Sequence, residues 1–148
     1  MATFNKLNGF VEHLAEKVHD LGTDQLVIAL SDTAPGSETP TAPTSSTAAC
    51  VLANVTQAAY TNLSTRNITT TSSAQTAGTY KLTLTDITLT STGGSTGPFR
   101  YVYIYNDAPT SPADPLIGYY DYGSSITLAD GESLTVNFDD TNGVLTLA

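Results

Sequence analysis

The chain has 148 residues, about the length of one domain, and its 5 basic and 14 acidic side chains give a formal net charge of −9. So few cations exclude an electrostatic surface for nucleic acid or for an anionic membrane, and no apolar run approaches the roughly 20 residues of a membrane helix. Hydrophobic residues make up 40% of the chain, alongside 26 Thr and 13 Ser, which predicts an acidic, soluble, β-rich domain rather than a disordered chain.

An amphipathic helix is predicted over the first 22 residues. Thr3 or Asn5 would cap its start, and Gly22 would end it in a left-handed conformation. His13 and His19 are six positions apart, so a helix separates them by about 240° and leaves both in solvent, without a shared metal ion. Apolar residues recur every three or four positions and form one stripe: Leu7, Phe10, Val11, Leu14, Val18 and Leu21.

A short strand is predicted at Leu26–Leu30, where five apolar residues in succession are typical of a strand buried on both faces. Residues 36–78 are rich in Pro, Ser and Thr, which predicts an irregular linker, or an arm that becomes ordered only against a neighbour. Within this segment, residues 48–60 fit a weak strand or a helix equally well. Cys50 has apolar neighbours in the sequence and is interpreted as a buried, unreactive thiol.

From residue 79 onward, apolar residues alternate with polar ones, as they do in half-buried strands. The alternation slips by one position at Asp86, where we expect a bulge or a bend because a slip reverses the buried face. Turns are expected at Asp130-Gly131 and over Asp139–Gly143. The predicted strands cover residues 80–84, 87–89, 99–105, 116–120, 126–128, 134–138 and 144–147.

Short strands at intervals of about ten residues predict a mainly β fold with one N-terminal helix (α+β), built as an antiparallel β-sandwich or small barrel. The chain is interpreted as a single domain with three regions. The helix and first strand occupy residues 1–35, the irregular segment residues 36–78, and the antiparallel β region residues 79–148.

The sequence contains no recognisable catalytic motif. It has no phosphate-binding loop and no dinucleotide fingerprint. Asp139, Asp140 and Asn142 resemble the start of a calcium loop, but the chain ends before a distal Glu, so a hairpin turn is the favoured interpretation. We therefore predict a protein that is not an enzyme, with no catalytic, cofactor-binding or metal-binding residues.

The strongest candidate for a functional surface is a group of tyrosines on two predicted neighbouring strands. Tyrosine is enriched at protein interfaces because it offers a large amphipathic contact area. Cross-strand packing inside the sheet explains the same pattern equally well, and both interpretations hold if alternate faces serve core and partner. On the strand at residues 99–105 the pattern places Phe99 on the tyrosine face and Val102 and Ile104 on the other. The candidate interface residues are Tyr101, Tyr103, Tyr105, Tyr119, Tyr120 and Tyr122.

Two parts of the chain resemble small virion proteins of tailed bacteriophages. The first runs from Phe4-Asn5-Lys6 through Phe10-Val11, Leu14-Ala15, Val18-His19 and Leu21-Gly22 to Thr33-Ala34-Pro35. The second comprises Gly97-Pro98-Phe99-Arg100-Tyr101, Tyr105-Asn106-Asp107, Asp114-Pro115-Leu116-Ile117-Gly118, Asp121-Tyr122-Gly123-Ser124, Gly131-Glu132 and Phe138-Asp139. Together they cover about two-thirds of the chain, whereas residues 36–77 carry no resemblance.

The resemblance implies a capsid decoration (cement) protein that binds the outside of the major capsid protein shell where capsomers meet, as a homo-oligomer and often as a trimer. No cofactor, nucleic acid or membrane is implied, and the expected location is the exterior of the virion capsid. Two alternatives remain open: a tail-associated structural protein, and a host-surface or glycan-binding module displayed on the virion. The first residues lack the basic start and apolar run of a secretory signal, so none is predicted.

Overall fold

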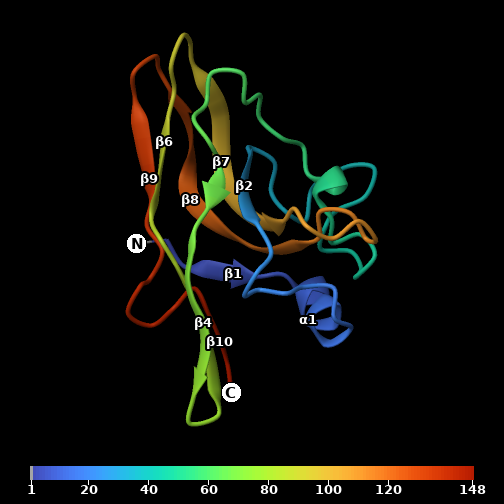
Figure 1. Cartoon of the computed structure of the whole chain (residues 1–148). Coiled ribbons are helices and arrows are strands. Elements are labelled where there is room, and N and C mark those ends of the chain that lie inside the picture. Colours follow the sequence, from blue (N-terminus) through green and yellow to red (C-terminus); the bar gives the residue numbers. More distant parts are fainter. Residues whose placement is uncertain (1) are drawn as a thin grey trace.

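A computed structural model describes residues 2–148 and confirms a mainly β fold with one α-helix near the N-terminus (Figure 1). Within these residues the strands form antiparallel sheets in the orders β1-β8-β7-β2-β3, β10-β5-β4 and β6-β9. In chain order the elements are β1 (Phe4–Lys6), α1 (Asn8–Ala15), β2 (Leu26–Ser31), the 3-10 helix η1 (Leu52–Asn54), β3 (Asn67–Ile68), β4 (Thr70–Thr76), β5 (Thr79–Leu84), β6 (Ile87–Thr90), β7 (Thr96–Asn106), β8 (Leu116–Leu128), β9 (Ser133–Val136) and β10 (Leu145–Leu147).

The main core lies between the five-stranded sheet and the two smaller sheets, in a sandwich-like arrangement. The large sheet contributes apolar side chains such as Ile28, Ile104 and Ile117, while the smaller sheets contribute side chains such as Leu84 and Leu89. The smaller sheets bury one face and leave the other exposed, as the alternating burial of β6 and β9 shows. Strand β2 lies inside the large sheet and is buried along its whole length, as the sequence predicted.

A second apolar cluster covers the opposite face of the large sheet and is closed by part of the segment that was predicted to be irregular. Cys50, Leu52 and Val55 pack there against Tyr103 and Leu116. Residues 49–55 therefore belong to the folded body, whereas the sequence suggested a linker or an arm. Cys50 is fully buried, and burial raises the pKa of its thiol to about 11, which agrees with an unreactive cysteine.

The C-terminal part of this segment also contains regular structure. Residues 67–68 form β3 and residues 70–76 form β4, although the sequence placed them in the irregular region. Their small hydroxyl side chains resemble loop composition, and strand pairing with β2 and β5 overrides that local tendency. Asp86 behaves as predicted, since it separates β5 from β6, which belong to different sheets. Its carboxylate accepts hydrogen bonds from the Phe138 backbone N–H (2.7 Å) and the Asn137 side chain (2.8 Å).

The predicted helix over residues 1–22 is wrong at both ends. Residues 4–6 form β1, which pairs antiparallel with β8 in the register Phe4 to Tyr120. The helix ends at Ala15, and Lys17 adopts a left-handed conformation (φ 67°) that turns the chain back on itself. As a result Val11 on the predicted apolar stripe is 51% exposed, while Leu21 still reaches the core from the loop.

Both histidines are buried, which contradicts the prediction that they are solvated. His19 lies beyond the end of the helix, and the returning chain brings its ring to 6.0 Å from that of His13. Asn106 donates from Nδ2 to His19 Nδ1 (3.2 Å) and to Asp24 (2.6 Å). Burial lowers the pKa of both imidazoles, to about 4 for His19, so both rings are neutral at pH 7.

A substitution at Gly118 tests the pairing of β1 with β8, because Gly118 lies in β8 opposite Lys6 of β1 and the two strands approach closely there. A Cβ at this position would lie 2.6 Å from the backbone oxygen of Asn5 and against the Phe4 ring. Gly118→Ala should therefore lower the free energy of unfolding in urea by about 1–3 kcal/mol. The matched control is Gly36→Ala in a loop, where the nearest atom is 3.8 Å away and a change within about 0.5 kcal/mol is expected. Equal losses in the two variants would contradict the β1–β8 contact.

Candidate interaction surface

The six candidate tyrosines do not form one exposed ribbon. Tyr101, Tyr103 and Tyr105 are at most 7% exposed in the second cluster, and Tyr120 is buried in the main core between Phe4 and Phe138. The half-buried Tyr119 lies against Tyr101 and Tyr103, with ring centroids at 6.1 Å and 5.7 Å. Packing within the chain thus accounts for the four buried rings. Tyr122 is 51% exposed and is the most accessible member of the group.

A large bulge in β8 separates Tyr122 from the other tyrosines. Phe99 pairs with Ile126, but Tyr101 pairs with Asp121, so the four residues 122–125 stand opposite Arg100 alone. The extra residues push Tyr122 out of the sheet and leave residues 122–125 exposed. The irregular register also puts Phe99 in the main core with Val102 and Ile104, which corrects its predicted place on the tyrosine face.

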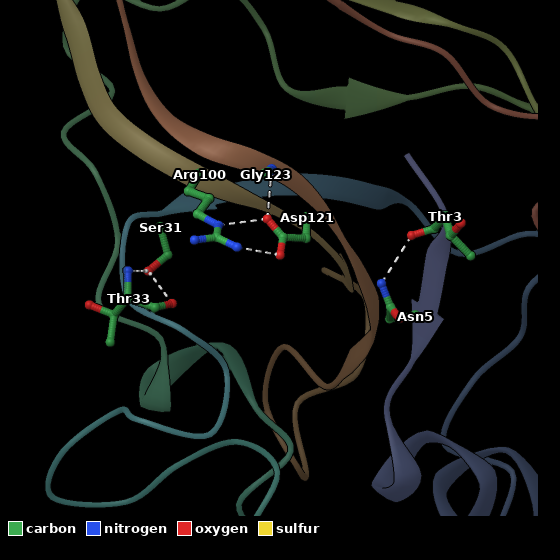
Figure 2. Close-up of polar contacts among 7 residues, drawn as sticks. All are labelled: Thr3, Asn5, Ser31, Thr33, Arg100, Asp121 and Gly123. Carbon is green, nitrogen blue, oxygen red and sulfur yellow. Dashed lines mark hydrogen bonds and ion pairs between the residues drawn. The ribbon is translucent and has the colours of Figure 1, made fainter. Parts of the chain in front are cut away.

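A bidentate ion pair between β7 and β8 stabilises the bulge (Figure 2). Arg100 donates from Nε and Nη2 to the two oxygens of Asp121, at 2.7 Å and 2.8 Å. The Gly123 backbone N–H donates to the same carboxylate (2.8 Å), and Gly123 has φ 93°, a conformation that favours glycine. The bonds from Arg100 lower the pKa of Asp121, so this carboxylate remains charged and the bulge has a defined shape.

Tyr122 borders an apolar groove between β8 and β9. The groove has a volume of about 220 Å³, and Tyr120, Val102, Leu134 and Val136 form its apolar wall. A second hollow of about 320 Å³ continues from it past Asn137 and Asp139. An exposed aromatic ring beside an apolar floor with a polar rim has the composition of a protein contact surface. We refer to Tyr122 and this groove as the Tyr122 surface.

Residues 139–143 form a turn, but not the hairpin turn that the sequence favoured, because it joins β9 to β10 and these strands belong to different sheets. Asp139 accepts hydrogen bonds from the backbone N–H groups of Asn142 (2.7 Å) and Thr141 (3.1 Å). It also accepts one from the Asn142 side chain (2.8 Å), and these bonds lower the pKa of Asp139. The carboxylate oxygens are therefore used in closing the turn. Among residues 2–148, no three His, Cys, Asp or Glu side chains gather as a metal site would require.

The sequence pointed to the strand that carries Tyr122 but did not reveal the bulge. The available signal was Gly123 inside a tyrosine-rich strand pattern, since an interior glycine often marks a bulge. The pairing of Arg100 with Asp121 had no such signal because the two residues are 21 positions apart. The prediction that the chain is not an enzyme stays a prediction.

Comparisons with protein-family models, with curated proteins and with solved structures found no match for this chain. Within the described residues, no helix is long and apolar enough to cross a membrane. The fold and the Tyr122 surface define an antiparallel β protein with a candidate contact site.

Proposed function

We propose that this chain is a structural protein of a tailed-bacteriophage virion that binds the outside of the capsid and stabilises contacts between capsomers. The observation that carries the proposal is the Tyr122 surface, an exposed aromatic side chain on a braced bulge beside an apolar groove. The partner is the major capsid protein, and the location is the exterior of the virion capsid. Such a role requires adhesion to a repeated protein surface and no chemistry.

The positions of the segments that resemble phage virion proteins support this proposal. Residues 4–6 form β1, residues 97–101 lie in β7, and residues 116–118 and 121–124 lie in β8. Strands β1, β8 and β7 are neighbours in the large sheet, so segments more than 90 positions apart in sequence come together there. The ion pair between Arg100 and Asp121 joins two of these segments directly. Several of the resembling segments thus lie side by side in the large sheet, and one of them carries Tyr122.

The charge and size of the surface suit a clamp that acts in many copies. The chain carries a net charge of −9, which disfavours binding to packaged DNA and keeps neighbouring particles apart. A groove of about 220 Å³ offers only a modest apolar contact for each copy. On a shell, many modest contacts held at fixed spacing add up to strong retention. We infer that the summed contacts resist the internal pressure of packaged DNA.

Tyr122→Ser tests the proposal at its central residue. Its affinity for capsid shells that lack this protein should fall at least 10-fold, because an aromatic side chain at the centre of an interface commonly contributes more than about 1.4 kcal/mol. Co-sedimentation with purified shells measures the affinity. Because Tyr122 is exposed, the urea unfolding curve should be nearly unchanged.

The matched control is Val11→Ser. Val11 is also 51% exposed but lies on α1, away from the Tyr122 surface, so its substitution should leave shell binding unchanged. Equal weakening by both variants, or none by either, would contradict the assignment. If Tyr122→Ser abolished adsorption to host cells while shell binding stayed intact, the glycan- or host-binding alternative would replace the capsid proposal. Few copies, all located on the tail, would favour the tail-associated alternative.

A further inference from the structure

Strand β4 presents an unpaired edge on a hairpin that extends away from the rest of the fold (Figure 1). It lies outermost in the sheet β10-β5-β4, and its seven residues pair only with β5. Among residues 2–148, no backbone hydrogen bond from outside this sheet reaches residues 70–76. Apart from Thr70 and Ser73, the residues of β4 are exposed. The edge therefore offers free backbone N–H and C=O groups to another strand.

This edge lacks the features that normally prevent strand addition. Proteins protect exposed edges with charged residues, proline or coverage by another element. Strand β4 has the sequence Thr-Thr-Ser-Ser-Ala-Gln-Thr and contains neither a charged residue nor a proline. One irregularity in its pairing lies between Thr70 and Ser72, at the start of the strand. Residues 72–76 remain regular and open.

The side chains of β4 suit pairing with an identical strand. In this fold, hydroxyl-to-hydroxyl hydrogen bonds join exposed neighbouring segments, and one of them already involves Thr71 of β4. They link Thr88 with Thr135 (3.0 Å), Thr90 with Ser133 (2.8 Å), and Thr71 with Thr85 (2.8 Å). A hydroxyl group both donates and accepts, so two copies of a Thr/Ser-rich strand are complementary in an antiparallel register.

Charge points to a second copy of this chain as the partner. Two copies with a net charge of −9 repel each other wherever their carboxylates meet. No Asp or Glu occurs between Glu38 and Asp86, and β4 lies inside this uncharged-to-basic stretch. The nearest charged residue of the hairpin, Lys81, is directed to the backbone oxygen of Thr141 in its own chain (3.0 Å). Strand β4 thus adds no carboxylate of its own to a contact between copies, and the neighbouring acidic residues Asp20 and Asp24 lie beside Ser73 and Thr70 rather than beside residues 74–76.

We propose that two copies of this chain associate by antiparallel pairing of β4 with β4 of the second copy, which joins their three-stranded sheets into one. The inference does not rest on the capsid proposal, because it concerns the isolated protein. A contact of this length belongs to the small, transient class of interfaces. The dimer becomes more populated when copies are held side by side, because their effective concentration is higher. The pairing is two-fold and makes dimers, whereas the trimer implied by the phage resemblance needs another contact.

Disulfide mapping in the full-length chain tests this pairing directly. Single cysteines are placed at Thr71, Ser72, Ala74, Gln75 and Thr76, and the variants are mixed in pairs under mild air oxidation. The native Cys50 is fully buried and does not compete. In an antiparallel pair, the residue numbers of opposed positions add up to the same value, so cross-linked dimers should form mainly between cysteine positions that share one sum. A control with Ser124→Cys in the exposed β8 bulge should give at least 10-fold less cross-linked dimer. A constant difference, or equal yields at all positions, would overturn the proposal.

A charge variant gives an independent measurement. Ala74→Lys puts a positive charge in the middle of the regular edge of both copies and should weaken dimerisation at least 10-fold in sedimentation velocity. Ser124→Lys changes the net charge equally and should have no such effect. Circular dichroism confirms that both variants are folded. Unchanged association of Ala74→Lys, or cross-linking of β4 to a shell protein with none between copies, would rule out pairing between copies.

Discussion

Replacing Tyr103 by alanine is expected to lower the free energy of unfolding by about 3–5 kcal/mol, the largest effect of any single substitution considered. Tyr103 is fully buried in the second cluster, where its ring lies 5.7 Å from that of Tyr119. Its removal leaves a cavity between β7 and residues 49–55, a segment that backbone hydrogen bonds from Leu52 to Asp114 (2.9 Å) and from Leu116 to Cys50 (2.9 Å) keep in place. Urea denaturation followed by circular dichroism measures the loss.

Tyr103→Phe is the matched control, and it should leave the free energy of unfolding unchanged or raise it. The Tyr103 hydroxyl is buried without a hydrogen-bond partner among the described residues, and burial raises the pKa of this phenol, so it stays protonated. Because no bond is lost, phenylalanine should leave the stability unchanged within about 0.5 kcal/mol or raise it. A loss of more than about 1 kcal/mol would show that the hydroxyl has a partner and that the packing described for this cluster is incomplete.

The second large effect is destabilisation by mild acid. The pKa of His19 is lowered to about 4, first by burial and then by His13, while Asp24 opposes the shift. In the unfolded chain the imidazole titrates near 6.5, so between pH 6.5 and 4 the unfolded state binds the proton more strongly. The stabilisation is complete above about pH 6.5 and falls as the pH approaches 4, by about 3 kcal/mol for His19. Urea unfolding at several pH values measures this dependence.

The pH range in which stability is lost distinguishes protonation of the histidines from protonation of carboxylates. His13 shares the same direction of shift, with Glu12 and Glu16 opposing it. The carboxylates with lowered pKa values, Asp121 and Asp139, lose their contribution only below their ordinary pKa. His19→Asn keeps an acceptor for Asn106 but does not titrate, so it should remove most of the dependence between pH 6.5 and 4. An unchanged pH profile in this variant would show that His19 is not the responsible group.

The parts of the fold that were predictable from sequence are those in which one short-range pattern dominates. The uninterrupted apolar run at Leu26–Leu30 predicted a strand buried on both faces, and the phase slip predicted a bulge or a bend at Asp86, where the chain leaves the sheet of β5 for that of β6. The helix was overextended because its apolar stripe continues after Ala15, although the stripe residue Leu21 reaches the core from a loop. Helical periodicity does not distinguish these two arrangements.

The candidate site was only partly predictable. Alternation along a strand shows which face of the sheet a side chain lies on, but not which other segment covers that face. Alternation correctly separated Tyr103 from Ile104, yet it could not show that residues 49–55 cover the tyrosine face. The exposure of Tyr122 depends on a bulge whose brace, Arg100 with Asp121, connects residues far apart in the chain. Likewise, the hydroxyl-rich composition of β4 suggested a loop, since its strand character comes from pairing with β5.

The most direct test of the central claim is the number and position of copies of this chain on the phage particle, measured by cryo-electron microscopy of purified virions. The account predicts density on the outer shell at repeated capsomer junctions, with the Tyr122 surface against the major capsid protein and a copy number comparable to that of the shell subunits. Particles without this chain should assemble but release DNA at a lower temperature. A bare shell, or equal thermal survival with and without the protein, would contradict the account.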